Sequence, residues 1–131
     1  MIAFQSVSKI YNNHGAALED VNFRINPGEF VSLVGRSGAG KYTVIKLMIG
    51  EDRPTKGRIF FGQYEVSKLG DHELPLFRRH IGIVFQDFRL LSNKNAFENV
   101  AFAMEAAARP QSEIKEMVPQ VLEMVGLSDK F

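Results

Sequence analysis

The alternation of apolar and polar residues predicts strands in the first half of the chain. Residues 2–7 (IAFQSV) and 21–25 (VNFRI) alternate between the two kinds of side chain, as strands do when one face is buried. Residues 30–35 (FVSLVG) and 81–86 (IGIVFQ) are nearly continuous apolar runs, which are typical of parallel strands buried on both faces. Residues 58–62 (RIFFG) predict one further strand.

Apolar residues at helical spacing predict helices in three places. The first is 43–50 (TVIKLMIG), which ends on a glycine, a common helix stop. The second is 96–108, which is rich in Ala, Glu and Met. The third is 112–125, with an apolar stripe and Ser112 as its N-cap. Pro119 lies inside this stripe, so we expect a kink or a break there.

The remaining segments complete the predicted order of elements. Residues 63–80 have no clear period, so we expect a polar, irregular connection in which Arg78 and Arg79 face solvent. Gly126 followed by Leu127 predicts a C-terminal helix cap. Strands come first, then an apolar strand, a glycine loop and a helix, and then further helices. This order predicts an α/β fold.

Composition narrows the function classes only slightly. The 131 residues are enough for one domain, and the net charge of +1 gives no reason to expect nucleic acid or an anionic membrane as a partner. The absence of cysteine excludes a disulfide, a thiolate metal site and a cysteine nucleophile within the chain. The first residues lack the pattern of a signal peptide, and no apolar run has the length of a bilayer span. We therefore expect a cytoplasmic protein whose membrane role, if any, needs a partner.

The stretch GRSGAGKYT, residues 35–43, places glycines and a lysine between an apolar run and a helix. Gly35, Gly40 and Lys41 match the pattern G-x-x-x-x-G-K of phosphate-binding loops. Glycines let the backbone wrap closely around a phosphate, and the following helix adds N–H donors and the positive end of its dipole. Lys41 supplies a mobile positive charge for the β- and γ-phosphates. The alternative is a glycine-rich turn with a surface lysine, which the flanking strand and helix patterns disfavour.

Several segments resemble named parts of the ABC-type ATPases. GRSGAGK resembles their Walker A loop, and SKIY (8–11) resembles the A-loop, whose aromatic residue, here Tyr11, stacks on adenine. GIVFQD (82–87) is similar to the Q-loop, whose glutamine, here Gln86, reaches the metal and the γ-phosphate. The resemblance implies ATP and Mg²⁺ as cofactors, with an ATP-binding set that consists of Tyr11, Gly35, Arg36, Ser37, Gly38, Ala39, Gly40, Lys41, Tyr42, Thr43 and Gln86. The residues alone leave two alternatives open: Tyr11 as a strand-end aromatic that packs on the core, and Gln86 as a surface amide.

Within these ATPases, the stretch 73–91 (ELPLFRRHIGIVFQDFRLL) is most similar to the FtsE family. This resemblance implies a subunit that dimerises head-to-tail across two ATP molecules and drives an integral membrane partner, FtsX, in bacterial cell division. It also implies a location at the inner face of the plasma membrane through that partner, and no nucleic-acid partner. The ATPases of lipoprotein-release and macrolide-export transporters have a similar pattern around the glutamine, and they remain the alternative.

Tyr42 departs from the Walker A pattern, in which a Ser or Thr follows the lysine and ligates Mg²⁺. A phenol hydroxyl lies several bonds further from the backbone, so it cannot occupy the same point without a backbone shift, and Thr43 comes one residue too late. The ring also has to fit at the start of a helix that packs against a sheet. We expect Mg²⁺ to be held by the phosphates and Gln86, with poorer positioning, so that hydrolysis suffers more than binding.

No segment of the 131 residues resembles the LSGGQ signature, the Walker B aspartate, the catalytic glutamate or the switch histidine of the family. We therefore expect no catalytic residue in this chain and interpret it as a partial nucleotide-binding domain. Residues 1–86 would hold the strands, the P-loop core and the Q-loop glutamine, and 87–131 would begin a helical subdomain. We expect apolar surface on 30–35 and 81–86 to be exposed. The alternative function is a nucleotide-binding module that does not hydrolyse ATP.

Overall fold

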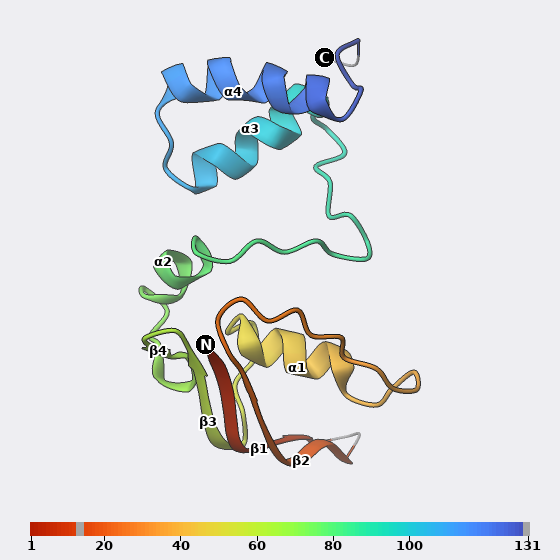
Figure 1. The fold of residues 1–131 in the computed structure, drawn as a ribbon, viewed down its shortest axis with the longest axis vertical. Helices are drawn as coiled ribbons and strands as arrows, with labels where there is room; N and C mark the ends of the chain where they lie inside the picture. The colour runs from red at the N-terminus through yellow and green to blue at the C-terminus, as the bar shows by residue number, and fades with distance from the viewer. Residues whose placement is uncertain (13–14, 130–131) are drawn as a thin grey trace. The chain divides into compact units, whose positions relative to one another are not determined.

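The computed structural model describes residues 1–12 and 15–129, and the contacts divide the chain into two units, Met1–Ile81 and Gly82–Phe131. The first unit is an antiparallel sheet with two α-helices and a short 3₁₀ helix, and the second consists of two helices and the segments that flank them (Figure 1). No helix in the described part of the chain has both the length and the apolar character of a membrane span.

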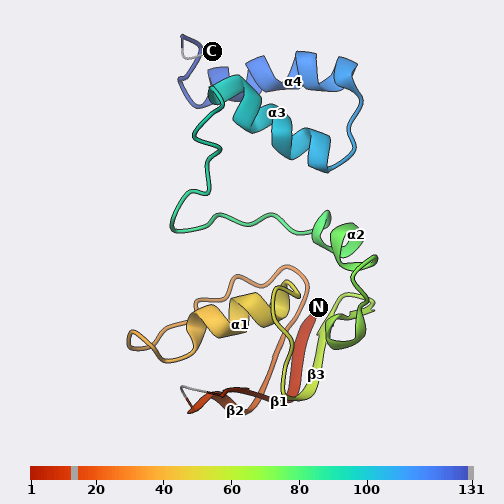
Figure 2. The ribbon, with the colours of Figure 1, turned by 180° about the vertical axis from the view of Figure 1, so that it is seen from behind.

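The sheet of the first unit has four antiparallel strands in the order β2-β1-β3-β4. Figure 2 labels β1 together with its two neighbours, β2 and β3. The strands predicted from alternating residues in this region are confirmed, and two of them are longer than predicted. Phe4 faces Phe23 across one ladder and Ile59 across the other, and the two phenyl rings stack with centroids 4.4 Å apart. The strands are β1 (Ile2–Tyr11), β2 (Gly15–Ile25), β3 (Lys56–Phe61) and β4 (Tyr64–Glu65).

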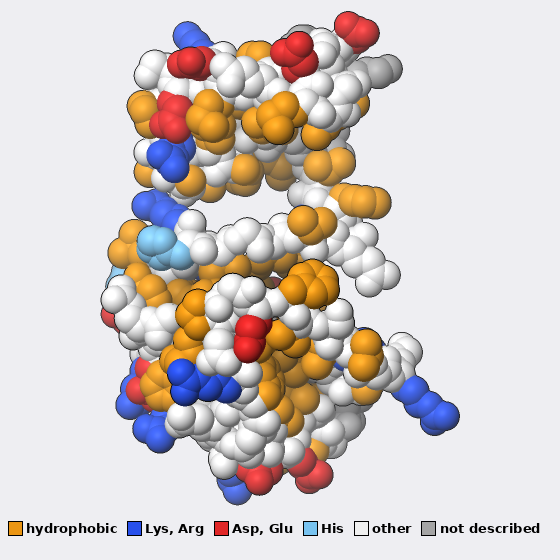
Figure 3. Space-filling model, viewed as in Figure 1, with side chains coloured by type: hydrophobic (Ala, Val, Ile, Leu, Met, Phe, Trp, Pro, Cys, Tyr) orange, Lys and Arg blue, Asp and Glu red, His pale blue; other side chains and the backbone are white. Residues whose placement is uncertain are grey.

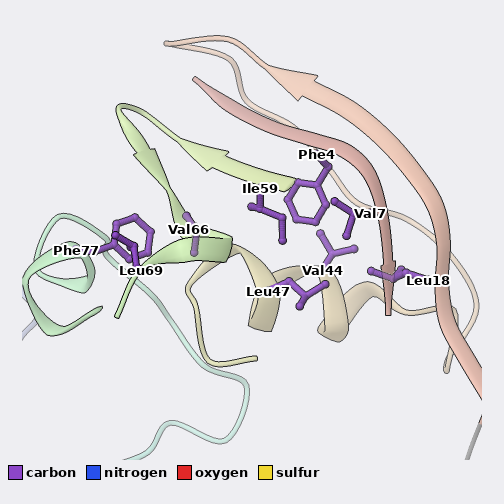
Figure 4. Packing of buried hydrophobic residues seen from close by; sticks show 9 residues of the cluster. All are labelled: Phe4, Val7, Leu18, Val44, Leu47, Ile59, Val66, Leu69 and Phe77. Atoms are coloured by element: carbon purple, nitrogen blue, oxygen red, sulfur yellow. The ribbon is translucent and has the colours of Figure 1, made fainter. Parts of the chain in front are cut away.

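Helix α1 (Lys41–Met48) packs its apolar stripe against this sheet. The helix predicted at 43–50 is therefore confirmed, although it begins two residues earlier and ends two residues earlier. Val44 and Leu47 are three residues apart, so they lie on the same side of the helix, and both are buried among residues of the strands. Figure 4 shows their side chains beside those of β1, β2 and β3.

The segment 63–80 is more regular than predicted. It contains a short 3₁₀ helix, η1 (Val66–Lys68), and helix α2 (Leu74–Arg78). Phe77 is 1% exposed and makes edge contacts with the rings of Phe61 and Tyr64. The sequence did not predict these elements, because each is too short to show a helical repeat of apolar residues.

Arg78 has a second role besides the predicted exposure. Its guanidinium donates hydrogen bonds to the carbonyl oxygens of Ile49 and Gly50, at 3.0 and 2.8 Å. These carbonyls follow the last turn of α1, where helix carbonyl groups lack partners and favour positive charge. Arg78 therefore ties α2 to the end of the P-loop helix.

The two nearly continuous apolar runs do not form the predicted buried strands. Neither 30–35 nor 81–86 is assigned to a strand, and neither pairs with another segment in the described part of the chain. A strand needs a hydrogen-bonded neighbour, and these segments have none among the described residues. The expected exposure is confirmed instead: Phe30, Val34 and Val84 are 96%, 85% and 98% exposed. Hydrophobic side chains are visible on the surface in Figure 3.

The second unit is built on α3 (Ala96–Ala106) and α4 (Gln111–Met124). Asn95 caps α3 in a capping box with Glu98, in which each side chain accepts from the backbone N–H of the other residue. The buried cluster between the helices consists of Ala101, Ile114, Val118 and Leu122.

The predicted ends of α4 are partly confirmed. Ser112 is not the N-cap, because the helix begins at Gln111 with Pro110 in the N-cap position. The helix continues through Pro119, so the chain has no break there. At the other end, Gly126 has φ 72° and the Leu127 N–H donates to the carbonyl of Leu122, as the predicted cap requires.

Candidate nucleotide-binding site

The loop before α1 takes a conformation that requires glycine at two points. Gly38 and Gly40 have φ values of 79° and 85°, in the left-handed region that other residues rarely adopt. Gly40 is the N-cap of α1 and also lies against β2, because a Cβ built there would be 2.6 Å from the carbonyl oxygen of Ala17. The sequence therefore sets both the turn of the loop and its close approach to the sheet.

The side chain of Lys41 folds back onto the backbone of this loop. Its ammonium donates to the carbonyl oxygens of Gly35 and Arg36, both at 2.7 Å. An ammonium has three donors, so two carbonyl contacts leave one for a further acceptor. The side chain thus places a positive charge over the backbone of the loop, and its contact with phosphates stays a prediction.

The start of α1 adds backbone donors to the same place. The first helical hydrogen bond runs from the Val44 N–H to the Gly40 carbonyl at 3.0 Å. The residues before that bond belong to the first turn of α1, at the positive end of the helix dipole. This dipole favours an anion at this end. Loop, lysine and helix start therefore lie together at the end of α1 that favours negative charge.

Tyr11, at the end of β1, lies close to the same helix. Its hydroxyl donates to Asp52 Oδ2 at 2.7 Å, and the side chain of Thr43 hydrogen-bonds to it as well. Burial and then the bond to Asp52 raise the pKa of Tyr11 above its usual range, against a lowering by Thr43. The structure thus brings Tyr11 and Thr43 together. Tyr11 is half-buried and does not belong to the hydrophobic core cluster, in contrast to the alternative that it packs there.

Asp52 and Lys9 belong to this arrangement and were missed by sequence reasoning. Asp52 Oδ1 accepts from Lys9 Nζ at 2.5 Å, and Lys9 Nζ also donates to the Arg53 carbonyl oxygen at 2.8 Å. Burial alone would raise the pKa of Asp52, but hydrogen bonds from Lys9 and Tyr11 outweigh it and hold the pKa below its usual range. No local pattern indicates a contact between residues that lie more than 40 positions apart.

Tyr42 is on the exposed side of α1. Its ring is 55% exposed, and the ammonium of Lys46, one turn later, lies 5.0 Å from the ring centroid. The ring therefore does not have to fit between helix and sheet, as the sequence had led us to expect. It lies along the outer surface of the helix beside a cation, a favourable contact for an aromatic face.

The two predicted metal positions, Tyr42 and Gln86, lie in different units of the chain. Gln86 is exposed and lies in the second unit, so its role at the metal stays a prediction. Among the described residues, no group of three or more His, Asp or Glu side chains is placed to hold a metal ion.

A glycine loop with a lysine at the start of a helix that packs on a sheet is typical of P-loop nucleotide-binding proteins. The family comparison narrows this class. Residues 18–130 match the family model described as ABC transporter, and the chain belongs to this family.

Curated relatives include cell-division proteins. The chain is 46% identical to the cell division ATP-binding protein FtsE of Bacillus subtilis and 44% identical to that of Mycobacterium tuberculosis; each match covers 99% of this chain and 57% of the relative. A methionine import ATP-binding protein, MetN, of Rhodopseudomonas palustris is 42% identical over 98% of this chain and 36% of its own length. The chain thus spans just over half the length of its FtsE relatives.

Solved structures show the same fold. One is a dimeric post-hydrolysis state of the ATP-binding cassette MJ0796 bound to ADP and Pi, with a TM-score of 0.84 and 33% identity. A second dimeric structure of MJ0796, described as a bacterial ABC transporter cassette, has a TM-score of 0.86 and 34% identity. Each match covers 96% of this chain and 57% of the solved chain. The predicted α/β fold of an incomplete ABC-type core is confirmed.

Proposed function

We propose that this chain forms the nucleotide-binding part of an FtsE-like subunit, which couples ATP binding and hydrolysis to a membrane partner in bacterial cell division. The observation that carries the proposal is the position of Lys41. Its ammonium lies over the carbonyls of Gly35 and Arg36, at the end of α1 that favours anions. This geometry suits the β- and γ-phosphates of a nucleoside triphosphate.

Two further observations support ATP as the nucleotide. Tyr11 is held beside the P-loop helix by Asp52 and Thr43, where its ring can stack on a base. The solved cassette at 33% identity is described as bound to ADP and Pi. The full proposed set is Tyr11, Gly35, Arg36, Ser37, Gly38, Ala39, Gly40, Lys41, Tyr42, Thr43 and Gln86, with Gln86 and the phosphates holding Mg²⁺.

The proposed partners follow from the relatives. Dimeric structures of a related cassette support a homodimer across two ATP molecules. The FtsE names of the relatives at 42–46% identity support an FtsX-like integral membrane subunit and a cytoplasmic location at the membrane's inner face. The MetN relatives show that the family is broader than cell division. A subunit of a lipoprotein-release or macrolide-export transporter is therefore the alternative.

Tyr42 favours a second candidate function, nucleotide binding without hydrolysis. The residue after the P-loop lysine normally gives Mg²⁺ a small hydroxyl ligand, and here it carries a ring on the outer surface of α1. Since phosphate contacts come from the backbone and Lys41, this change affects the metal more than the nucleotide. Binding would persist while the chemical step slows.

Two measurements on the purified chain test the proposal. Isothermal titration measures ATP binding with and without Mg²⁺, and a phosphate-release assay measures turnover under the same conditions. We expect ATP to bind, with negligible release, because no segment of the 131 residues resembles the family's catalytic glutamate or signature. Sustained release that disappears in a Lys41→Ala variant would contradict the expectation of no catalytic residue. Absence of ATP binding would contradict the proposed function.

A further inference from the structure

Asp52 links three parts of the first unit through one carboxylate. It lies in the connection between α1 and β3, and its side chain is 25% exposed. Oδ1 accepts from Lys9 Nζ at 2.5 Å and from the Arg53 N–H at 2.8 Å, and Oδ2 accepts from the Tyr11 hydroxyl at 2.7 Å. The carboxylate is therefore shared between the loop and two side chains of β1.

These contacts fix the Tyr11 ring at two points. The hydroxyl is held at the far end of the ring by the charged oxygen of Asp52, a strong acceptor. The Lys9 ammonium, itself held by Asp52, lies 4.9 Å from the ring centroid. With a cation over one face, a planar partner would have to stack on the opposite face of the ring. Without the carboxylate, the hydroxyl loses its acceptor, and the ammonium keeps only the Arg53 carbonyl oxygen.

We propose that Asp52 is a positioning residue for base recognition, which holds the Tyr11 ring in the orientation that stacks on adenine. The proposal rests on the proposed function, because it assumes that the P-loop binds ATP. Asp52 itself touches neither base nor phosphate in this account. It acts on the base through Tyr11 and leaves the phosphate contacts of Lys41 unchanged.

The sign of the charge effect makes the proposal testable. Asp52 is an anion, so removing it favours any polyphosphate by simple electrostatics. A purely electrostatic role would therefore give tighter binding of ATP and of tripolyphosphate in Asp52→Ala. A positioning role gives weaker binding of ATP with no weakening of tripolyphosphate, because only ATP has a base to stack. The two roles predict changes of opposite direction for ATP.

The experiment compares dissociation constants of Mg-ATP and Mg-tripolyphosphate by isothermal titration. The variants are Asp52→Ala, Asp52→Asn, Tyr11→Phe and the double variant Tyr11→Phe/Asp52→Ala. Glu51→Ala is the matched control, because it removes the same charge from the neighbouring exposed residue. Melting curves establish that each variant is folded. If Asp52→Ala does not fold, the ATP affinities of Asp52→Asn and Tyr11→Phe decide instead. Asp52→Asn keeps an acceptor for the hydroxyl and should bind ATP more tightly than Tyr11→Phe, which has no hydroxyl to hold.

We expect Asp52→Ala to weaken ATP binding about tenfold, the size of a lost base stack, and to leave tripolyphosphate binding unweakened. Asp52→Asn keeps an acceptor for the hydroxyl, so it should recover most of the affinity. In the Tyr11→Phe background, Asp52→Ala should cost less than it does in the wild type, because the route through the hydroxyl is gone and only the route through Lys9 remains.

Equal weakening of ATP and tripolyphosphate would overturn the inference and assign Asp52 a general structural role. An unchanged or tighter ATP affinity in Asp52→Ala would overturn it as well. Both outcomes leave the proposed function intact, since the wild-type protein still binds ATP. Wild-type protein that binds neither ligand would overturn the proposed function, and this inference with it.

Discussion

The backbone of Gly40 lies so close to β2 that a Cβ at this position would be 2.6 Å from the carbonyl oxygen of Ala17. Gly40 also has φ 85°, so both its conformation and its surroundings require glycine. Gly38 shares the left-handed conformation at φ 79° but has no atom within 4 Å of such a Cβ. Substitutions at these two glycines therefore separate the effect of backbone strain from the effect of close packing against β2.

We predict that Gly40→Ala lowers the free energy of unfolding more than Gly38→Ala does. The strained backbone costs about 1–2 kcal/mol at either position. Only Gly40→Ala adds the collision with β2, which has to push the loop away from the sheet. Urea denaturation of both variants measures the difference. Equal losses would mean that the loop moves freely relative to β2 and that the close approach has no energetic weight.

Leu47→Ala should lower the free energy of unfolding by about 2–5 kcal/mol, because it leaves a cavity in the core under the sheet. Leu47 is 0% exposed, whereas Ile45 on the same helix is 37% exposed. Ile45→Ala is therefore the matched control and should cost clearly less. The midpoint of urea denaturation reports both changes. A loss for Ile45→Ala as large as that for Leu47→Ala would mean that α1 buries a different face.

The contact of Asp52 with Lys9 and Tyr11 predicts a pH dependence of stability. The pKa of Asp52 is lowered in the folded protein, although burial alone would raise it, because Lys9 and Tyr11 stabilise the charged form. This contribution is fully present above the unfolded pKa, about 3.9, and is lost as the pH falls through the lower folded pKa. The stability difference between wild type and Asp52→Asn should therefore shrink as the pH falls below about 4.

Urea denaturation of the two proteins between neutral and acid pH measures this difference. Asp71→Asn provides the control, because it removes an exposed carboxylate of the same unit. A difference that grows toward acid pH would show that Asp52 is not stabilised in its charged form, contrary to the contacts described.

Sequence patterns predicted the local elements better than their environment. Alternation located the antiparallel strands, and the glycine loop with Lys41 was placed correctly at the start of α1. The apolar runs 30–35 and 81–86 were predicted to be buried strands, and they are exposed and unpaired in the described part of the chain. The hydrophobicity of a segment indicates a tendency to be buried but does not show which segment will pack against it. A strand forms only where a neighbouring strand supplies backbone hydrogen bonds.

In the candidate site, too, the local conformation could be predicted and the long-range contacts could not. Its loop could be predicted because adjacent residues define it, and the conformations of Gly38 and Gly40 follow from their type. The side-chain hydrogen bonds of Asp52 and Arg78 could not be predicted, because their partners are far away in the sequence. Such contacts form only in the folded chain, so no repeating pattern in the sequence indicates them.

Tyr42→Ser should raise the rate of ATP hydrolysis far more than it changes ATP affinity. Lys41 and the backbone bind the phosphates in both variants, whereas only serine gives Mg²⁺ a small hydroxyl ligand, which matters most in the transition state. A gain of ~3 kcal/mol there corresponds to a rate factor on the order of a hundred. The test uses a chimaera that joins residues 1–131 to the part of the Bacillus subtilis relative beyond the match.

The matched control for this prediction is Tyr42→Phe, which keeps the ring and removes the hydroxyl. Equal kcat values for the original chimaera and Tyr42→Ser would show that another group holds the metal. A large change in ATP affinity without a change in kcat would show that the ring obstructs the pocket, and that the assignment of Tyr42 to the metal is wrong.

The central claim is that Lys41 binds the phosphates of ATP, and paired lysine variants test it most directly. Lys41 donates to the loop carbonyls, whereas Lys46, on the same helix, lies over the Tyr42 ring. Both variants remove one positive charge from α1, and isothermal titration measures their affinity for Mg-ATP. We predict that Lys41→Ala weakens binding at least about tenfold, the loss of a charge-assisted phosphate contact, and that Lys46→Ala stays within about twofold of wild type. Equal affinities for the two variants would contradict the account.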